Sequence, residues 1–292
     1  MKTLLLQLIV FFLCLGASSQ DTTYYYGPNN REAKDIREAR RYKEVKKKFG
    51  NRYKVTTFAL INDEWVFTRV ERIRGGNKGK FRFRFRENTL FSKSYSRQYE
   101  EQGPGTFFFK DTKRGRVLRE GNTSRKIPVH FDGLVTEYYD DETVRSESLY
   151  RNHKLVSNKN WLPDGTKYID NLFYSVDHPP VYTLGDNFLK KYITGMIAEK
   201  NLPVTEIQDE LLIGWVITKG GNIDGVRILM GRVESVNVFF VETIESAPGK
   251  WEPALLDGDK VNYFITMPVN FKNTVPLVQN VEISGGTLHW DY

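Results

Sequence analysis

Residues 80–86 read Lys-Phe-Arg-Phe-Arg-Phe-Arg, a strict alternation of basic and aromatic side chains. Successive side chains of an extended strand point to opposite faces, so the phenylalanines share one face and the arginines the other. Surfaces that bind single-stranded nucleic acid also combine arginine with aromatic residues, but they need those rings exposed for stacking. We therefore expect a half-buried antiparallel strand here and no nucleic-acid partner.

The region before this strand predicts a basic helix. Asn30 can cap its start and Gly50 can end it, and a modest apolar stripe faces a strongly basic opposite side. Packing against the following strands is the expected use of this helix, and lying on a membrane surface is the alternative. The stripe consists of Ile36, Ala39, Tyr42, Val45 and Phe49.

The region after the strand contains a loose internal repeat. Residues 105–121 read as two short strands joined by a turn, and residues 133–148 repeat the scheme. Stacked hairpins of this kind form an open sheet that buries little unless neighbouring elements cover it. The pattern Gly133…Glu137-Tyr138-Tyr139 resembles degenerate MORN-type repeats over about residues 105–170, which implies a structural or interaction unit.

The last hundred residues change character. A helix is expected from Gly185-Asp186, followed by strands at 211–218 and 223–230, a helix at 233–244 and a last strand at 260–271. The fold class expected is α+β. A three-stranded antiparallel sheet carries two helices on one face, preceded by the basic helix and mainly antiparallel β-hairpin repeats.

The order of these elements resembles the TonB carboxy-terminal domain over roughly residues 180–272. The segment Pro248-Gly249-Lys250-Trp251-Glu252-Pro253 matches the family's Pro-Lys-Trp-x-Pro segment with one inserted glycine. The resemblance implies structural roles for six motif residues: Tyr182, Gly221, Trp251, Pro253, Gly258 and Pro268.

The same resemblance implies binding by strand addition. A short extended peptide from an outer-membrane receptor or another envelope protein would pair with the exposed edge of the last strand. Pro268 lacks a backbone donor and would mark where pairing stops. The edge residues expected to hold the peptide are Lys260, Val261, Asn262, Tyr263, Phe264, Ile265, Thr266 and Met267.

One feature of the family is missing. An energy transducer of this family resembles a tethered rod with a Pro-rich spacer, and this chain has no such spacer. We therefore expect a periplasmic adaptor in TonB-type outer-membrane transport. The alternative is a structural envelope protein that uses the TonB-like domain for self-association or cell-wall contact.

The amino terminus predicts export. Met1-Lys2 precedes an apolar run from Leu4 to Leu15, and small residues at Ala17 and Ser19 favour cleavage before Gln20. The run is short for a spanning helix, which leaves a retained anchor as the alternative. We expect a periplasmic mature chain without a spanning helix. The expected divisions are a signal peptide (1–19), a basic region (20–100), hairpin repeats (101–177), the TonB-like domain (178–272) and a tail (273–292).

Charge divides the mature chain into two parts. Residues 20–126 hold 28 Lys and Arg against 13 Asp and Glu, whereas residues 127–292 hold 14 against 23. In an exported protein, anionic lipid headgroups or cell-wall polymers are the expected counterparts of a basic half. A solvated basic face without a partner is the alternative.

Composition and motifs argue against an enzyme. Aromatic residues at 14% are too frequent for wholesale disorder, and Cys14, the only cysteine, lies in the leader. His130, His153, His178 and His289 lack metal-ligand spacing. We therefore expect no catalytic residues, no cofactor and no metal site.

Overall fold

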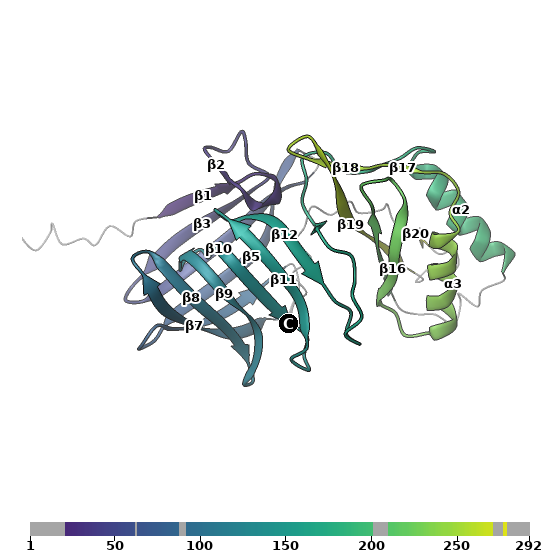
Figure 1. Cartoon of the computed structure of the whole chain (residues 1–292). Helices are drawn as coiled ribbons and strands as arrows, with labels where there is room; N and C mark the ends of the chain where they lie inside the picture. Colours follow the sequence, from purple (N-terminus) through teal and green to yellow (C-terminus); the bar gives the residue numbers. More distant parts are fainter. Residues whose placement is uncertain (1–20, 62, 88–91, 201–209, 271–276, 279–292) are drawn as a thin grey trace, which may run out of the picture.

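The computed structural model describes residues 21–61, 63–87, 92–200, 210–270 and 277–278. The expected leader and most of the expected tail lie outside these residues. Within them the fold is mainly β: a twelve-stranded antiparallel, near-closed barrel and a second, curled mixed sheet with two helices (Figure 1). The α+β fold class expected from the sequence is therefore wrong.

The barrel is one meander in the order β12-β11-β10-β9-β8-β7-β6-β5-β4-β3-β1-β2. The expected division at residue 100 falls inside one of its strands. The strands are β1 (Thr22–Tyr26), β2 (Glu32–Ala33), β3 (Arg41–Lys48), β4 (Arg52–Ile61), β5 (Glu64–Gly75), β6 (Lys80–Arg86), β7 (Lys93–Gly103), β8 (Thr106–Lys113), β9 (Arg116–Arg125), β10 (His130–Tyr138), β11 (Val144–Arg151) and β12 (Lys154–Asn160), with a 3-10 turn η1 (Pro28–Asn30).

The predicted half-buried strand at residues 80–86 is confirmed as β6. Phe83 and Phe85 are buried, whereas Arg82, Arg84 and Arg86 are exposed. The buried face continues through the neighbouring strands and forms the core of the barrel interior, with Val45, Val55, Ile73 and Phe83 packed together.

The predicted basic helix at residues 30–49 is wrong. This segment forms η1, β2 and β3, and β3 pairs with β1 on one side and β4 on the other. Two members of the expected apolar stripe, Ile36 and Phe49, are 44% and 97% exposed. The hydrogen bonds supplied by two neighbouring strands outweigh the helical spacing, because every backbone group of β3 can be satisfied in the sheet.

The expected open sheet of hairpin repeats is also wrong, because the sheet curls on itself. At the seam the side-chain amide of Asn29 in η1 donates to the Leu155 carbonyl of β12 at 2.8 Å. The turn between β9 and β10 folds inward, with Ile127 packed against the Val45 cluster and Val129 against Phe109 and its neighbours. Closure thus buries apolar surface that an open sheet would expose.

The second sheet contains six strands among the described residues, in the order β13-β19-β15-β16, with β18 and β20 also paired to β19. The predicted positions of its helices and three main strands are confirmed. β14 and β17 pair with each other in a separate two-stranded sheet. The elements of this part of the chain are β13 (Leu172–Phe173), β14 (Val181–Tyr182), α2 (Asp186–Glu199), β15 (Glu210–Ile217), β16 (Ile223–Met230), α3 (Glu234–Glu245), β17 (Trp251–Glu252), β18 (Ala254–Leu256), β19 (Asp259–Asn270) and β20 (Leu277–Val278).

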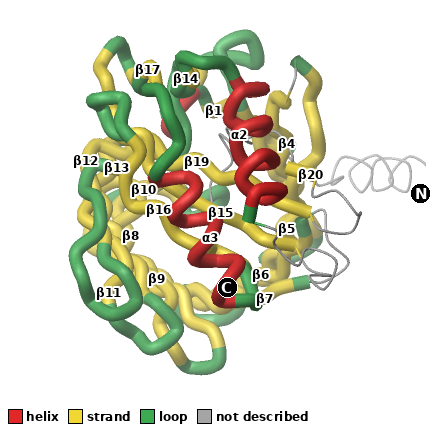
Figure 2. Tube along the Cα trace, turned by 90° about the vertical axis from the view of Figure 1, so that its right-hand side faces the viewer, coloured by secondary structure: helices red, strands yellow, loops and turns green. Residues whose placement is uncertain are grey.

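Both faces of this sheet are covered. Helices α2 and α3 lie over one face (Figure 2), where Leu189, Ile193 and Phe240 pack against Trp215 and Ile265. Residues from the connection between β12 and α2 cover the other face around Val216 and Phe264. None of the helices described here has the length and apolar character needed to cross a membrane.

Candidate functional site

The predicted peptide-binding strand is β19, which is an interior strand of the second sheet. Along Tyr263–Asn270 it pairs with β15. On the opposite edge β13 adds in parallel, with Leu172 beside Asn262 and Phe173 beside Tyr263, and β20 adds at Val269 and Asn270. β18 pairs with Val261 and Lys260. The expectation that Lys260, Val261, Asn262 and Tyr263 lie on a free edge is therefore wrong, because other segments of the chain pair there.

The side chains of β19 are also engaged. Tyr263, Ile265 and Met267 are buried under the helices, as the alternating pattern predicts. Phe264 and Thr266 are buried on the other face. Asn262 accepts a hydrogen bond from the Lys219 amide at 2.9 Å and donates to the Asp170 carbonyl at 3.0 Å. These side chains position the strand and are not presented to a partner.

The motif residues shared with the TonB-like pattern hold local structure together. Tyr182 pairs with Trp251 across β14 and β17, and its hydroxyl donates to the Pro248 carbonyl. Gly221 has φ 78°, and a Cβ placed there would lie 2.1 Å from the Trp251 carbonyl oxygen. Pro253 lies in the connection from β17 to β18.

The remaining two motif residues belong to β19 and its hairpin. Asp257 and Gly258 form the two-residue β18–β19 turn with φ 52° and 88°, which favours glycine at the second position. Pro268 lies opposite Leu212 of β15. The six residues share structural roles rather than one site.

A groove of about 360 Å³ lies where the barrel meets the second sheet, between β12 and the β18–β19 hairpin. Its apolar lining includes Leu155, Phe173 and Leu256, each 7% exposed and packed together. Val156 is 41% exposed beside them. The full lining is Arg151, Lys154, Leu155, Val156, Phe173, Leu256, Asp257, Asp259 and Val261.

The groove is bordered by side chains of both charges. Asp257 forms ion pairs with Lys154 and, at 3.4 Å, with Arg31. Its backbone amide donates to the Asp177 carboxylate at 2.6 Å, which ties the hairpin turn to the preceding connection. Arg151 and Asp259 add one further charge of each sign. An apolar floor with mixed charges at its edge is suited to a short peptide segment.

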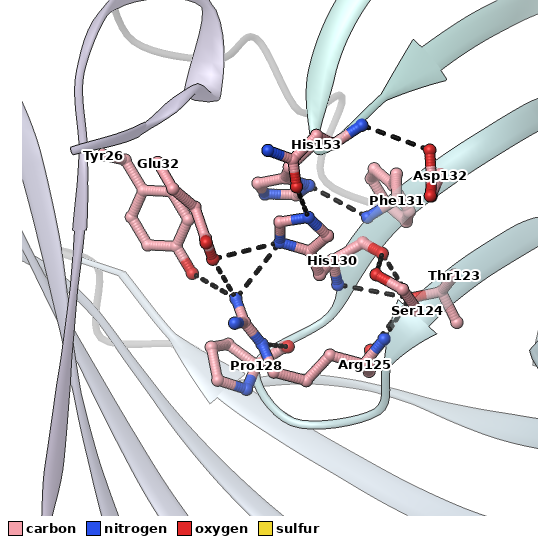
Figure 3. Close-up of polar contacts among 11 residues, drawn as sticks. Tyr26, Glu32, Thr123, Ser124, Arg125, Pro128, His130, Phe131, Asp132 and His153 are labelled. Carbon is pink, nitrogen blue, oxygen red and sulfur yellow. Dashed lines mark hydrogen bonds and ion pairs between the residues drawn. The ribbon is translucent and has the colours of Figure 1, made fainter. Parts of the chain in front are cut away.

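A polar cluster that the sequence did not predict lies at the barrel seam (Figure 3). Arg125 donates to the Glu32 carboxylate at 2.8 Å, and His130 Nδ1 lies 3.1 Å from the same oxygen. The Tyr26 ring packs on His153 with centroids 5.5 Å apart, and the rings of His130 and His153 stack at 5.0 Å. Residues more than ninety positions apart meet here, so no local spacing indicates the cluster.

Two members of this seam cluster, His153 and Tyr26, are held in their neutral forms. The Phe131 amide donates to His153 Nδ1 at 3.0 Å, which places the ring proton on Nε2. Burial, with Lys43 and His130 nearby, holds the pKa of His153 well below its ordinary value. Burial raises the pKa of Tyr26 to about 12. The cluster therefore joins β1 and β2 to β9–β12.

In the described part of the chain, no group of three or more His, Cys, Asp or Glu residues could hold a metal ion. Neither a protein-family model, nor a curated protein, nor a solved structure matches the chain.

Proposed function

We propose that the protein is an exported, non-enzymatic adaptor that binds an extended segment of another envelope protein in the groove between β12 and the β18–β19 hairpin. The partner class, an outer-membrane receptor of TonB-type transport, follows from the sequence resemblance of residues 180–272. The single observation that supports the groove as the binding site is its apolar floor bordered by Arg151, Lys154, Asp257 and Asp259.

The groove is a better candidate than the edge of β19. Strand pairing at Lys260–Tyr263 is already supplied within the chain, so a partner would have to displace β13 or β18 before adding there. Val156 instead presents its apolar side chain at the groove without displacement of any element. One apolar side chain of a partner could be buried against this floor beside Val156, and the border charges would set its orientation.

Site-specific crosslinking tests the proposal. The chain from residue 20 onward has no cysteine, so Val156→Cys carries the only thiol. A thiol-reactive photocrosslinker at Val156→Cys should label one envelope protein in intact cells. Leu134→Cys is the matched control, because Leu134 is 49% exposed on β10 and does not line the groove.

A peptide measurement completes the test. The labelled segment of the partner, made as a synthetic peptide, should bind residues 20–292 at roughly micromolar Kd and lose about tenfold in affinity to Val156→Asp. Equal labelling at positions 156 and 134, or equal peptide binding by the wild type and Val156→Asp, would contradict the groove as the binding site.

Self-association is the second candidate, favoured by one observation. β16 is the end strand of the second sheet, and Met230 at its end is 48% exposed. An end strand offers unpaired backbone groups to a second copy of itself. Light scattering should then show dimers that Met230→Glu dissociates, whereas a wild-type chain that stays monomeric at high micromolar concentration would exclude this role.

A further inference from the structure

The outer face of β3, β4, β5 and β6 carries basic residues in register. Lys48 lies opposite Arg52, Arg52 opposite Arg74, and Arg74 opposite Arg82. A second row two residues further along the strands repeats the arrangement. We call these two rows the basic face: Lys48, Arg52, Arg74 and Arg82, with Lys46, Lys54, Arg72 and Arg84.

Few charges of the basic face are paired with an acidic residue. All of its members except Lys46 are exposed, and Lys46 alone forms an ion pair among the described residues, at 3.5 Å with Asp21. Like charges directly opposite each other destabilise a sheet. With strands about 4.8 Å apart, four strands concentrate these charges in a band about 15 Å wide. A surface that keeps this repulsion is suited to an anionic partner.

An exposed aromatic residue adjoins the basic face. Phe49 is 97% exposed in the turn between β3 and β4, directly after Lys48. Gly50 follows it with φ 65°, and Arg52 opens the next strand. No other large apolar side chain described is exposed to more than 52%. An apolar tip flanked by basic residues can insert at a lipid–water interface while its neighbours reach the headgroups.

We propose that the basic face and Phe49 dock the barrel on a bilayer surface rich in anionic headgroups. The basic face extends over four adjacent strands, which suits an extended charged surface. The aromatic residues of β6 are buried on the opposite side, so they cannot stack nucleotide bases. The exposed Phe49 distinguishes a bilayer from a soluble polyanion, because only the bilayer offers an apolar layer to bury it. This inference is independent of the groove.

Vesicle sedimentation of residues 20–292 tests the docking. The chain should sediment with vesicles of three parts phosphatidylcholine to one part phosphatidylglycerol, and should stay in solution with phosphatidylcholine alone. Raised salt should release it, because screening weakens surface charge interactions. Arg74→Gln with Arg82→Gln should weaken binding more than tenfold, since each basic residue near an anionic surface contributes about fivefold. Phe49→Ser should weaken it about tenfold.

Control variants remove the same amount of charge, or another exposed apolar side chain, elsewhere in the chain. Lys159→Gln with Lys191→Gln removes two exposed lysines, and Leu134→Ser removes an exposed apolar side chain. Both should bind vesicles as the wild type does. Heparin binding should fall with the arginine pair and not with Phe49→Ser.

Three results would overturn the docking. One is a chain that binds heparin but not anionic vesicles. Another is vesicle binding insensitive to Phe49→Ser, and the third is an equal loss with the control variants.

Discussion

Asp111 is the most constrained charge in the barrel interior. It is 1% exposed and accepts two hydrogen bonds from Arg97, at 2.5 and 2.6 Å, and one from Arg119 at 2.7 Å. Asp111 and Arg119 belong to a cross-strand row of polar residues, which continues through Glu137 to Ser146. Burial alone would raise the pKa of Asp111, but the two guanidinium groups outweigh it and hold the pKa below its ordinary value.

Replacing this carboxylate tests how much the row contributes. Asp111→Asn removes the counter-charge that Arg97 and Arg119 share in the barrel interior, so the free energy of unfolding should fall by about 3–5 kcal/mol. Urea titration measures it. The triple variant Arg97→Met, Asp111→Leu and Arg119→Met should lose much less stability, because no uncompensated charge remains. A single variant as stable as the wild type would show that water reaches the site.

Lys43 gives a pH-dependent prediction at the same scale. Burial lowers its pKa to about 7, against the attraction of Glu71 and with the help of nearby guanidinium groups. Its ammonium lies 5.2 Å from the Tyr26 ring centroid. As the pH falls from the ordinary lysine pKa towards 7, the unfolded chain takes up this proton first, so stability decreases.

The corresponding variant is Lys43→Met. It should be more stable than the wild type at pH 7, and should lose the rise in stability that the wild type shows between pH 7 and 9. Thermal melts across this range measure both effects. Lys54→Met, at an exposed position of β4, should change neither. A destabilised Lys43→Met with an unchanged pH profile would contradict the assignment.

At the scale of elements, the sequence pattern predicted those helices and strands whose apolar spacing is clear within the segment itself. The alternation at residues 80–86 and the apolar spacing of α2 and α3 each carry their own signal. The apolar residues of 41–48 fit both the helical and the strand spacing, and this segment forms a strand because β1 and β4 pair with it. Tyr42 stacks on Phe58 of β4 at 4.7 Å, while Val45 points into the barrel. The pattern of one segment cannot predict which strands will pair with it.

The β15–β16 hairpin offers a prediction with an internal control. Gly221 approaches the Trp251 carbonyl so closely that Gly221→Ala must displace β17, and its positive φ adds strain. A loss of about 2–4 kcal/mol is expected. The adjacent Gly220 has no atom within 3.5 Å of an added Cβ, so Gly220→Ala should change stability by less than about 0.5 kcal/mol. Equal effects in chemical denaturation would refute the close contact.

At the scale of the whole molecule, the prediction failed where contacts are distant in sequence. The seam joins Asn29 to Leu155 across 126 positions, and Arg125 to Glu32 across 93. The candidate groove likewise combines residues of β12 and the β18–β19 hairpin. β13 is two residues long and precedes the expected boundary at residue 178, yet it belongs to the second sheet. Such a short strand carries no periodicity of its own.

The placement of β13 changes the expected folding unit. Residues 162–177 supply Leu172 and Tyr174, which cover Val216 and Phe264, and Tyr168 donates to the Gly225 carbonyl at 2.7 Å. A fragment of residues 178–292 loses this cover and should be less stable than residues 162–292 by about 3–6 kcal/mol, the value of burying two or three large side chains. Calorimetry should show a cooperative melt for the longer fragment and a broad or low one for the shorter. A synthetic peptide of residues 162–177 added to the shorter fragment should raise its melting temperature. β13 lies far from β19 in the sequence, so it can pair with β19 as a separate chain. Equal melts for the two fragments would instead show that the helices and β15, β16 and β19 form a sufficient core without that cover.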